Sequence, residues 1–190
     1  YMVPNYLQIF HLARSLGIIV KTLPLRHELG WQWDPDELEK LVSLKTKMIV
    51  VCNPNNPTGA IMQHEIMDLV IKIAEENDCW ILSDEVYRGA ELEGEECRSF
   101  AFSTEKTIVN SGLSKAYSLP GLRIGWTVGS KTYINRAWSF HDFTVINVSY
   151  LSDWIASKIL ECERRKKILN RTKDHLTHNL NILYDWALDI

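Results

Sequence analysis

The sequence has 190 residues, of which 46% are hydrophobic and 24% are charged. This balance is typical of a soluble globular protein, excludes a disordered chain, and allows one α/β domain with a sizeable core. The formal net charge is −3 and the isoelectric point is near 6.1. No overall basic field can therefore attract nucleic acid or an anionic membrane, and we expect a small-molecule partner instead.

The cysteines, the absence of targeting motifs and the first residue indicate the cellular environment and the completeness of the chain. The 4 cysteines include no Cys-x-x-Cys pair, and the 6 histidines are scattered, so we expect reduced, mostly buried thiols and no metal site. No long apolar run, signal peptide or lipidation motif is present, which favours the cytoplasm. Because the chain starts at Tyr1 and not at a methionine, we expect a fragment of a longer protein.

The first part of the chain predicts two helices with an extended segment between them. Apolar spacing over residues 7–16 indicates a helix that ends at Gly17, where a positive φ is tolerated. Residues 18–23 alternate imperfectly, as in a short strand. Asp34 precedes a proline in a helical first turn and so predicts a helix over residues 35–44.

The middle of the chain predicts a βαβ unit. Residues 48–52 are a continuous apolar, β-branched run, typical of a strand covered on both faces in a parallel sheet. An amphipathic helix over about residues 63–76 and a second strand over residues 79–82 follow. Further strands are predicted over residues 107–110 and 123–128, and right-handed crossovers would make the sheet mostly parallel.

From about residue 131 the pattern is helical. Leucines at positions 169, 176, 180 and 183 predict a long helix to the C-terminus, and the basic run 164–167 is predicted to be a solvated face of that helix. We expect a three-layer α/β/α fold in which residues 1–190 form one large-domain unit, and residues 131–190 approach a smaller domain.

Polar loops follow three of the predicted strands. They read Asn53-Pro54-Asn55-Asn56-Pro57-Thr58-Gly59, Ser83-Asp84-Glu85-Val86-Tyr87 and Ser111-Gly112-Leu113-Ser114-Lys115. Singly, they could be turn residues, a helix cap and an ordinary exposed lysine. Ligands in open α/β sheets bind beyond the carboxyl ends of the strands, so together the loops predict one site.

The segment from Ser111 to Trp126 resembles the Schiff-base loop of fold-type-I pyridoxal 5′-phosphate (PLP) enzymes, especially class I and II aminotransferases. The resemblance extends over about residues 4–129. It implies that Lys115, eight residues before Arg123, binds PLP covalently and that Arg123 binds the phosphate. An amine attacks an aldehyde only when it is unprotonated, which favours a buried lysine, and a planar guanidinium suits a dianionic phosphate.

The same resemblance assigns roles to further residues. Asp84 would pair with the protonated pyridine nitrogen of PLP, while Tyr87 and Asn56 would hydrogen-bond its phenolic oxygen. Tyr6, in the segment Pro4-Asn5-Tyr6, is the candidate for stacking on the ring.

Departures from the family pattern are also visible. Gly112 stands where many members have a phosphate-binding serine, so that Ser111, Ser114 or neither would replace it. The glycine-rich phosphate loop and the substrate-carboxylate arginine of the family have no counterpart here, which again predicts an incomplete chain.

The resemblance implies an aminotransferase that moves an amino group between an amino acid and a 2-oxo acid, as a homodimer. Carbon–sulfur lyases, cyclising synthases and decarboxylating relatives use the same residues, so the reaction type stays open. A non-catalytic PLP-fold domain, as in regulators fused to a DNA-binding module, and a fragment that binds PLP poorly are the remaining alternatives.

Overall fold

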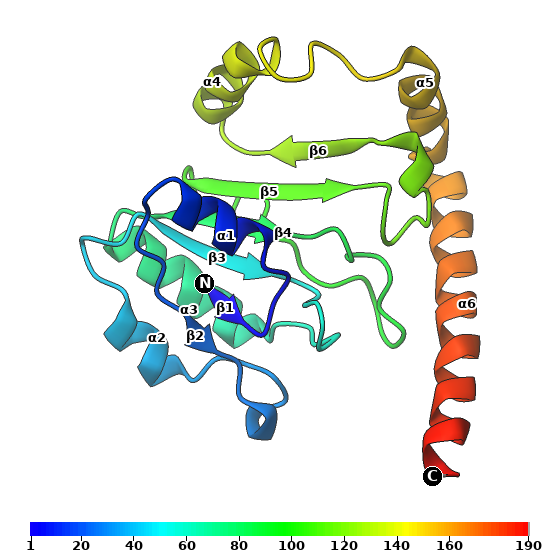
Figure 1. The fold of residues 1–190 in the computed structure, drawn as a ribbon, viewed down its shortest axis with the longest axis horizontal. Coiled ribbons are helices and arrows are strands. Elements are labelled where there is room, and N and C mark those ends of the chain that lie inside the picture. The colour runs from blue at the N-terminus through cyan, green and yellow to red at the C-terminus, as the bar shows by residue number, and fades with distance from the viewer. Residues whose placement is uncertain (190) are drawn as a thin grey trace.

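A four-stranded sheet forms the centre of the protein, whose structure, a computed structural model, describes residues 1–189 (Figure 1). Its strands are β3 (Met48–Cys52), β4 (Trp80–Asp84), β5 (Thr107–Gly112) and β6 (Gly125–Val128), in that order. The first three strands run parallel, and β6 pairs antiparallel with β5. The predicted α/β class with a mostly parallel sheet is confirmed.

Helix α3 (His64–Glu76) connects β3 to β4 and packs against both strands. Its buried face includes Met67 and Val70, each 0% exposed, and it meets Ile81 of β4, which is also 0% exposed. The apolar periodicity predicted this face because a helix that covers a sheet hides one stripe of side chains. The βαβ unit is therefore confirmed, with β4 two residues longer than predicted at its carboxyl end.

The N-terminal segment adds a small second sheet beside the first. Strands β1 (Met2–Val3) and β2 (Leu23–Pro24) pair in parallel, and α1 (Gln8–Ser15) lies between them in sequence. The strand predicted over residues 18–23 is mostly wrong, since only Leu23 belongs to β2 and Ile19 is 90% exposed. Strand propensity depends on context, and here β1 pairs only with Leu23 and Pro24.

The predicted N-terminus of the second helix is confirmed at α2 (Pro35–Leu41), which follows the short 3₁₀ helix η1 (His27–Leu29). Asp34 accepts hydrogen bonds from the backbone N–H groups of Asp36 and Glu37, at 2.9 Å and 3.3 Å. These bonds satisfy donors that have no partner inside the helix. The helix ends three residues earlier than predicted.

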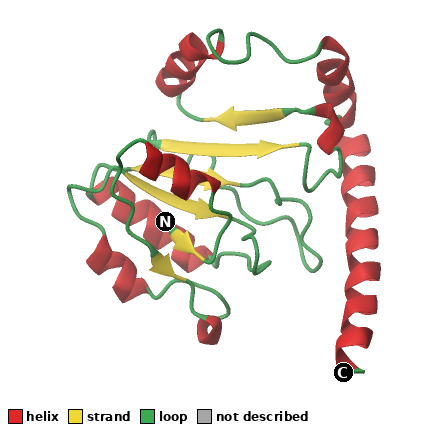
Figure 2. Cartoon of the chain, in the orientation of Figure 1, coloured by secondary structure: helices red, strands yellow, loops and turns green. Residues whose placement is uncertain are grey.

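Within residues 1–189, three helices follow β6, and Figure 2 draws them in red. They are α4 (Lys131–His141), α5 (Tyr150–Ile159) and α6 (Cys162–Leu188). The predicted long C-terminal helix is confirmed as α6, which runs alongside the sheet past the carboxyl ends of its parallel strands (Figure 1). The assignment of residues 1–190 to one large-domain unit stays a prediction.

The predicted thiol pattern is confirmed, because Cys52, Cys79 and Cys97 are buried free thiols and only Cys162 is exposed. Within residues 1–189, no helix combines the length and the apolar character needed to cross a membrane.

Replacing Ile81 with alanine is expected to lower the free energy of unfolding by about 2–5 kcal/mol, because the substitution leaves a cavity under α3. Ile81 is fully buried in the main core. Urea unfolding followed by circular dichroism measures the change. The matched control is Ile19→Ala, at a 90% exposed position, which is expected to stay within about 0.5 kcal/mol of the wild type. Equal losses in the two variants would contradict this assignment of the core.

Candidate active site

The carboxyl ends of β3, β4 and β5 lie side by side. Cys52 is in register with Asp84, and Asp84 with Asn110. Backbone hydrogen bonds continue past the strand ends, from the Asn53 N–H to the Asp84 carbonyl at 2.9 Å and from the Glu85 N–H to the Asn110 carbonyl at 2.8 Å. The three polar loops therefore begin at one edge of the sheet, where the parallel topology predicted them.

Hydrogen bonds within the loop after β3 fix its conformation. The buried amide oxygen of Asn53 accepts the N–H of Met62 at 2.9 Å. Across the turn, the N–H of Gly59 donates to the carbonyl of Asn55 at 2.9 Å, and Gly59 has a φ of +71°, which favours glycine. This turn presents Asn56, whose amide nitrogen donates to the Tyr87 hydroxyl at 3.2 Å.

Asp84 is a partly buried carboxylate at the end of β4. Burial raises its pKa, and this effect is only partly offset by the N–H of Val86, which it accepts at 3.2 Å, and by the positive charge of Lys115. The structure thus brings Lys115 and Asp84 into electrostatic contact. A carboxylate in this position gains stability from any additional cationic group that comes close to it.

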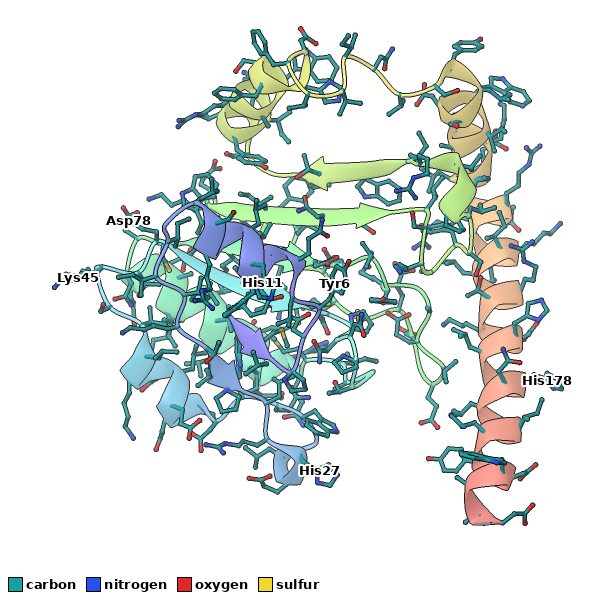
Figure 3. All side chains as sticks on the ribbon, viewed as in Figure 1. Tyr6, His11, His27, Lys45, Asp78 and His178 are labelled. Atoms are coloured by element: carbon teal, nitrogen blue, oxygen red, sulfur yellow. The ribbon has the colours of Figure 1, made fainter. Side chains whose placement is uncertain are left out.

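Tyr87 joins the same group of side chains. Burial is the main cause that raises the pKa of its phenol, followed by the proximity of Cys52 and of the Asp84 carboxylate, while the hydrogen bond from Asn56 lowers it. Tyr6 contributes a small further increase and is 59% exposed. Figure 3 places Tyr6 on the side toward which the parallel strands point.

The loop that carries Lys115 is fixed by its backbone. The Leu113 N–H donates to the Ile124 carbonyl at 3.0 Å, and the Ala116 N–H donates to the Val86 carbonyl at 3.2 Å. Leu113 and Ala116 are buried, whereas Lys115 is exposed. The apolar neighbours of Lys115 take the inward positions, and the burial of the lysine beside a bound cofactor stays a prediction.

Gly112 departs from the family pattern for a steric reason. A Cβ atom at this position would lie 2.9 Å from the backbone oxygen of Ile124, so the β5–β6 pairing excludes a serine here. The Ser111 hydroxyl donates to the Glu85 carbonyl at 3.1 Å. Among residues 1–189, the Ser114 hydroxyl makes no hydrogen bond, so it is the one of the two candidate serines whose hydroxyl is uncommitted.

Arg123 follows the 3₁₀ helix η2 (Pro120–Leu122) in a left-handed conformation, with a φ of 55°. Its guanidinium donates to the Pro120 carbonyl at 2.8 Å, and the residue is exposed. Within the described part of the chain, this side chain makes no hydrogen bond with the group around Asp84. Its role as a phosphate ligand therefore stays a prediction.

Two further residues lie beside Asp84 that the sequence did not single out. Burial raises the pKa of the Tyr1 phenol to about 12, with smaller contributions from Cys52 and Asp84. Burial also raises the pKa of the Cys52 thiol to about 12, followed by the charge of Asp84. The place of Cys52 at the end of a predicted strand was a usable signal, whereas Tyr1 reaches the site only through the β1–β3 packing.

Residues 2–187 match the model of the family described as Aminotransferase class I and II. The chain belongs to this family. Aminotransferases of this family depend on PLP, so the predicted cofactor class is confirmed.

Relatives that this chain matches are about twice its length. The aspartate/prephenate aminotransferase of Thermus thermophilus is 28% identical over 94% of this chain and 48% of that protein. A PLP-dependent aminotransferase from Streptococcus suis superposes with a TM-score of 0.89 at 35% identity, over 100% of this chain and 50% of that one. Capreomycidine synthase of Streptomyces vinaceus is 27% identical over 97% of this chain and 47% of that protein. The chain therefore spans about half the length of the relatives it matches.

Replacing Asp84 with asparagine is expected to raise the free energy of unfolding at neutral pH when PLP is absent. The folded-state pKa of Asp84 lies above its ordinary value, so ionisation penalises the folded state as the pH rises through that pKa. Below the reference pKa of about 3.9, both states are protonated and the substitution has little electrostatic effect. Urea unfolding of both proteins over a pH series measures the difference.

Asp78→Asn is the matched control with the opposite sign. A hydrogen bond from Lys106 at 2.5 Å lowers the pKa of Asp78, and its φ of 52° is a conformation that asparagine tolerates. A lowered pKa stabilises the fold above the ordinary value, and this stability is lost as the pH falls through the folded-state pKa. Asp78→Asn is therefore expected to destabilise the protein at neutral pH. Destabilisation by both variants would contradict the buried state of Asp84.

Proposed function

We propose that this chain is the cofactor-binding part of a PLP-dependent aminotransferase that moves an amino group between an amino acid and a 2-oxo acid. One observation carries the proposal: Asp84, Lys115 and the hydrogen-bonded pair Asn56–Tyr87 lie together at the carboxyl edge of the sheet. Each of these groups has a counterpart on PLP. The acid matches the pyridine nitrogen, the amine matches the aldehyde, and the phenol–amide pair matches the phenolic oxygen.

The residues present fit the cofactor. Burial raises the pKa of the Asp84 carboxylate, and the nearby positive charge offsets this only in part. A protonated pyridine nitrogen supplies a further positive charge. Tyr87 and Asn56 offer a hydroxyl and an amide beside it, the donors that a phenolic oxygen accepts. Lys115 is exposed on the same side, so its amine is accessible to an aldehyde.

When bound, PLP supplies an electron sink for substrate carbanions. The chain supplies the groups that hold and move protons. The Nζ atom of Lys115, once released, is the general base that takes the α-proton of the amino acid and the acid that returns it. Asp84 keeps the ring nitrogen charged, and Tyr87 with Asn56 orients the ring. Arg123 and Ser114 are proposed phosphate ligands, and Tyr6 is the proposed stacking residue.

A second candidate is a cyclising synthase or a lyase of the same fold. The similarity to a protein named capreomycidine synthase over 97% of this chain favours it. Lys115 and Asp84 would do the same work in such an enzyme, because the choice of reaction depends on which substrate bond stands perpendicular to the ring. A non-catalytic PLP-binding domain would keep the cofactor contacts and turn over no substrate.

Mixing the chain with PLP is expected to give a long-wavelength absorbance band that borohydride fixes covalently to Lys115. Lys115→Ala is expected to lose both the band and the attachment, because within residues 1–189 Lys115 is the cation whose charge acts on Asp84. Absorbance spectra and peptide mass spectrometry after reduction measure the two effects. Lys45→Ala, which removes an exposed lysine far from the site (Figure 3), is the matched control. Attachment that persists in Lys115→Ala would overturn the assignment, and products from amino acid screening would separate the candidate reactions.

We also propose that the protein is a homodimer in the cytoplasm. The segment from α4 to α5, which lies above β6 in Figure 1, exposes many large apolar side chains. They are Trp138, Phe140, Phe143, Val145, Ile146, Tyr150, Leu151 and Trp154. An exposed apolar patch of this kind marks an interaction surface, and a second copy of the chain is the proposed occupant. The buried free thiols fit a reducing compartment.

Phe143→Asp is expected to weaken dimerisation by at least about tenfold, because it places a charge where 87% of the aromatic side chain is exposed on the patch. Sedimentation velocity over a concentration series measures the dimer. Phe102→Asp, at an 80% exposed phenylalanine outside the patch, is expected to leave it unchanged. A wild-type chain that is monomeric throughout, or an equal effect of the two variants, would refute the proposed interface.

A further inference from the structure

The basic run at the start of α6 is not a uniformly solvated face, as the sequence pattern predicted. Arg164, Lys166 and Lys167 are exposed, but Arg165 is turned toward the protein and only partly exposed. Its Nε donates to the Tyr117 hydroxyl at 2.9 Å, and its Nη2 lies 2.7 Å from both carboxylate oxygens of Glu96. One guanidinium thus joins two loops of the sheet edge to α6.

Glu96 is itself held from the other side. Arg88, in the segment after β4, forms an ion pair with Glu96 at 2.7 Å. The Nε of Arg88 also donates to the Cys97 carbonyl at 2.8 Å. Charged groups that are fixed by several partners lose little further freedom when they bind. Arg165 therefore docks against a carboxylate whose position is already set.

Tyr117 is the member of this network that bears on the site, because it lies two residues after Lys115. It is 4% exposed, and its ring meets Trp126 of β6 edge to face at 6.3 Å. The guanidinium of Arg165 lies 5.9 Å from the centre of the same ring. Both the ring and the hydroxyl of Tyr117 are thus fixed, the hydroxyl by α6 alone.

A second contact joins α6 to the same loop two turns further on. The hydroxyls of Ser118 and Thr172 lie 3.2 Å apart, and Thr172 is buried. Between the two contacts, the buried Leu169 packs in one cluster with Leu113 and Tyr117. The segment that carries Lys115 therefore rests against α6 along one side.

Lys115 depends on this support because its own side chain is exposed and makes no hydrogen bond within residues 1–189. Its backbone neighbours fix the Cα atom from which the amine extends. The Leu113 N–H bond to Ile124 holds the chain before the lysine, while the Ala116 N–H bond to Val86 and the contacts of Tyr117 hold the chain after it. A small displacement of a reacting group has a large effect on rate.

We propose that Arg165 is a positioning residue, which holds the backbone segment from which the Lys115 amine extends, through its hydrogen bond to Tyr117. The inference rests on the proposed function and deepens it. It also links the lysine to the far end of α6, where Leu176 and Leu180, with Asn56 and Tyr87, line a groove of about 630 Å³. One helix thereby holds the lysine loop and forms a wall beside the Asn56–Tyr87 pair.

The test combines two readouts on the 190-residue chain. The first is hydrogen exchange of the amides in residues 113–119 without PLP, and the second is the rate at which PLP becomes attached to Lys115, trapped by borohydride. Tyr117→Phe removes only the hydroxyl, and Arg165→Met keeps the aliphatic stem. Arg164→Met, on the exposed face, is the matched control.

Tyr117→Phe and Arg165→Met are each expected to slow attachment by about three- to tenfold, the range for the loss of one ordinary hydrogen bond. They are also expected to speed amide exchange in residues 113–119. The double variant is expected to be no slower than the slower single variant, because both remove the same interaction. Arg165→Lys, which keeps the charge, is expected to restore part of the rate.

Three results would overturn the inference while leaving the proposed function intact. They are unchanged attachment in Tyr117→Phe, additive effects in the double variant, and an Arg165→Met variant that melts earlier but attaches PLP at the wild-type rate. A wild-type chain that attaches no PLP to Lys115 overturns the proposed function, and the inference with it. The exchange data then show separately whether Arg165 fixes the loop.

Discussion

The parallel register of β3, β4 and β5 is the constraint on which the rest of the site depends. It places Cys52, Asp84 and Asn110 at the same level of three adjacent strands. Each loop that leaves this edge is then tied to its neighbour by a backbone hydrogen bond. Residues separated by about 60 positions in the sequence, such as Asn56 and Lys115, thus reach one site without any direct bond between them.

The electrostatics of this edge follow from the same packing. Asp84 sits in a partly buried place beside the phenols of Tyr1 and Tyr87 and the thiol of Cys52, and none of these three groups carries a positive charge. Burial therefore raises the pKa of Asp84, and the exposed Lys115 only partly compensates. A site that leaves a carboxylate short of positive charge favours a cationic ligand, because binding recovers the free energy lost by desolvation.

Short sequence patterns correctly predicted those elements whose structure depends on neighbouring residues in the chain. The apolar run of residues 48–52 became β3 without a shift, and Asp34 caps α2 as its sequence indicated. The pattern failed where a distant partner decides the outcome. Of the predicted strand over residues 18–23, only Leu23 joins a ladder, because β1 pairs with Leu23 and Pro24. The sequence pattern predicted that Arg165 is a solvated surface charge. Its partner Glu96 is far away in the sequence, so the pattern could not show that the two side chains meet.

The departure at Gly112 shows how the sheet constrains the chemistry. The antiparallel strand β6 brings the Ile124 carbonyl so close that a side chain on residue 112 would meet it at 2.9 Å. A serine at that position would have to displace a backbone that also holds the loop, through the bond from the Leu113 N–H to the same Ile124 oxygen. A side chain at residue 112 would therefore require the backbone of β6 to shift. The Ser111 hydroxyl is committed to the Glu85 carbonyl, which favours Ser114 over Ser111 in the proposal that a serine binds the phosphate.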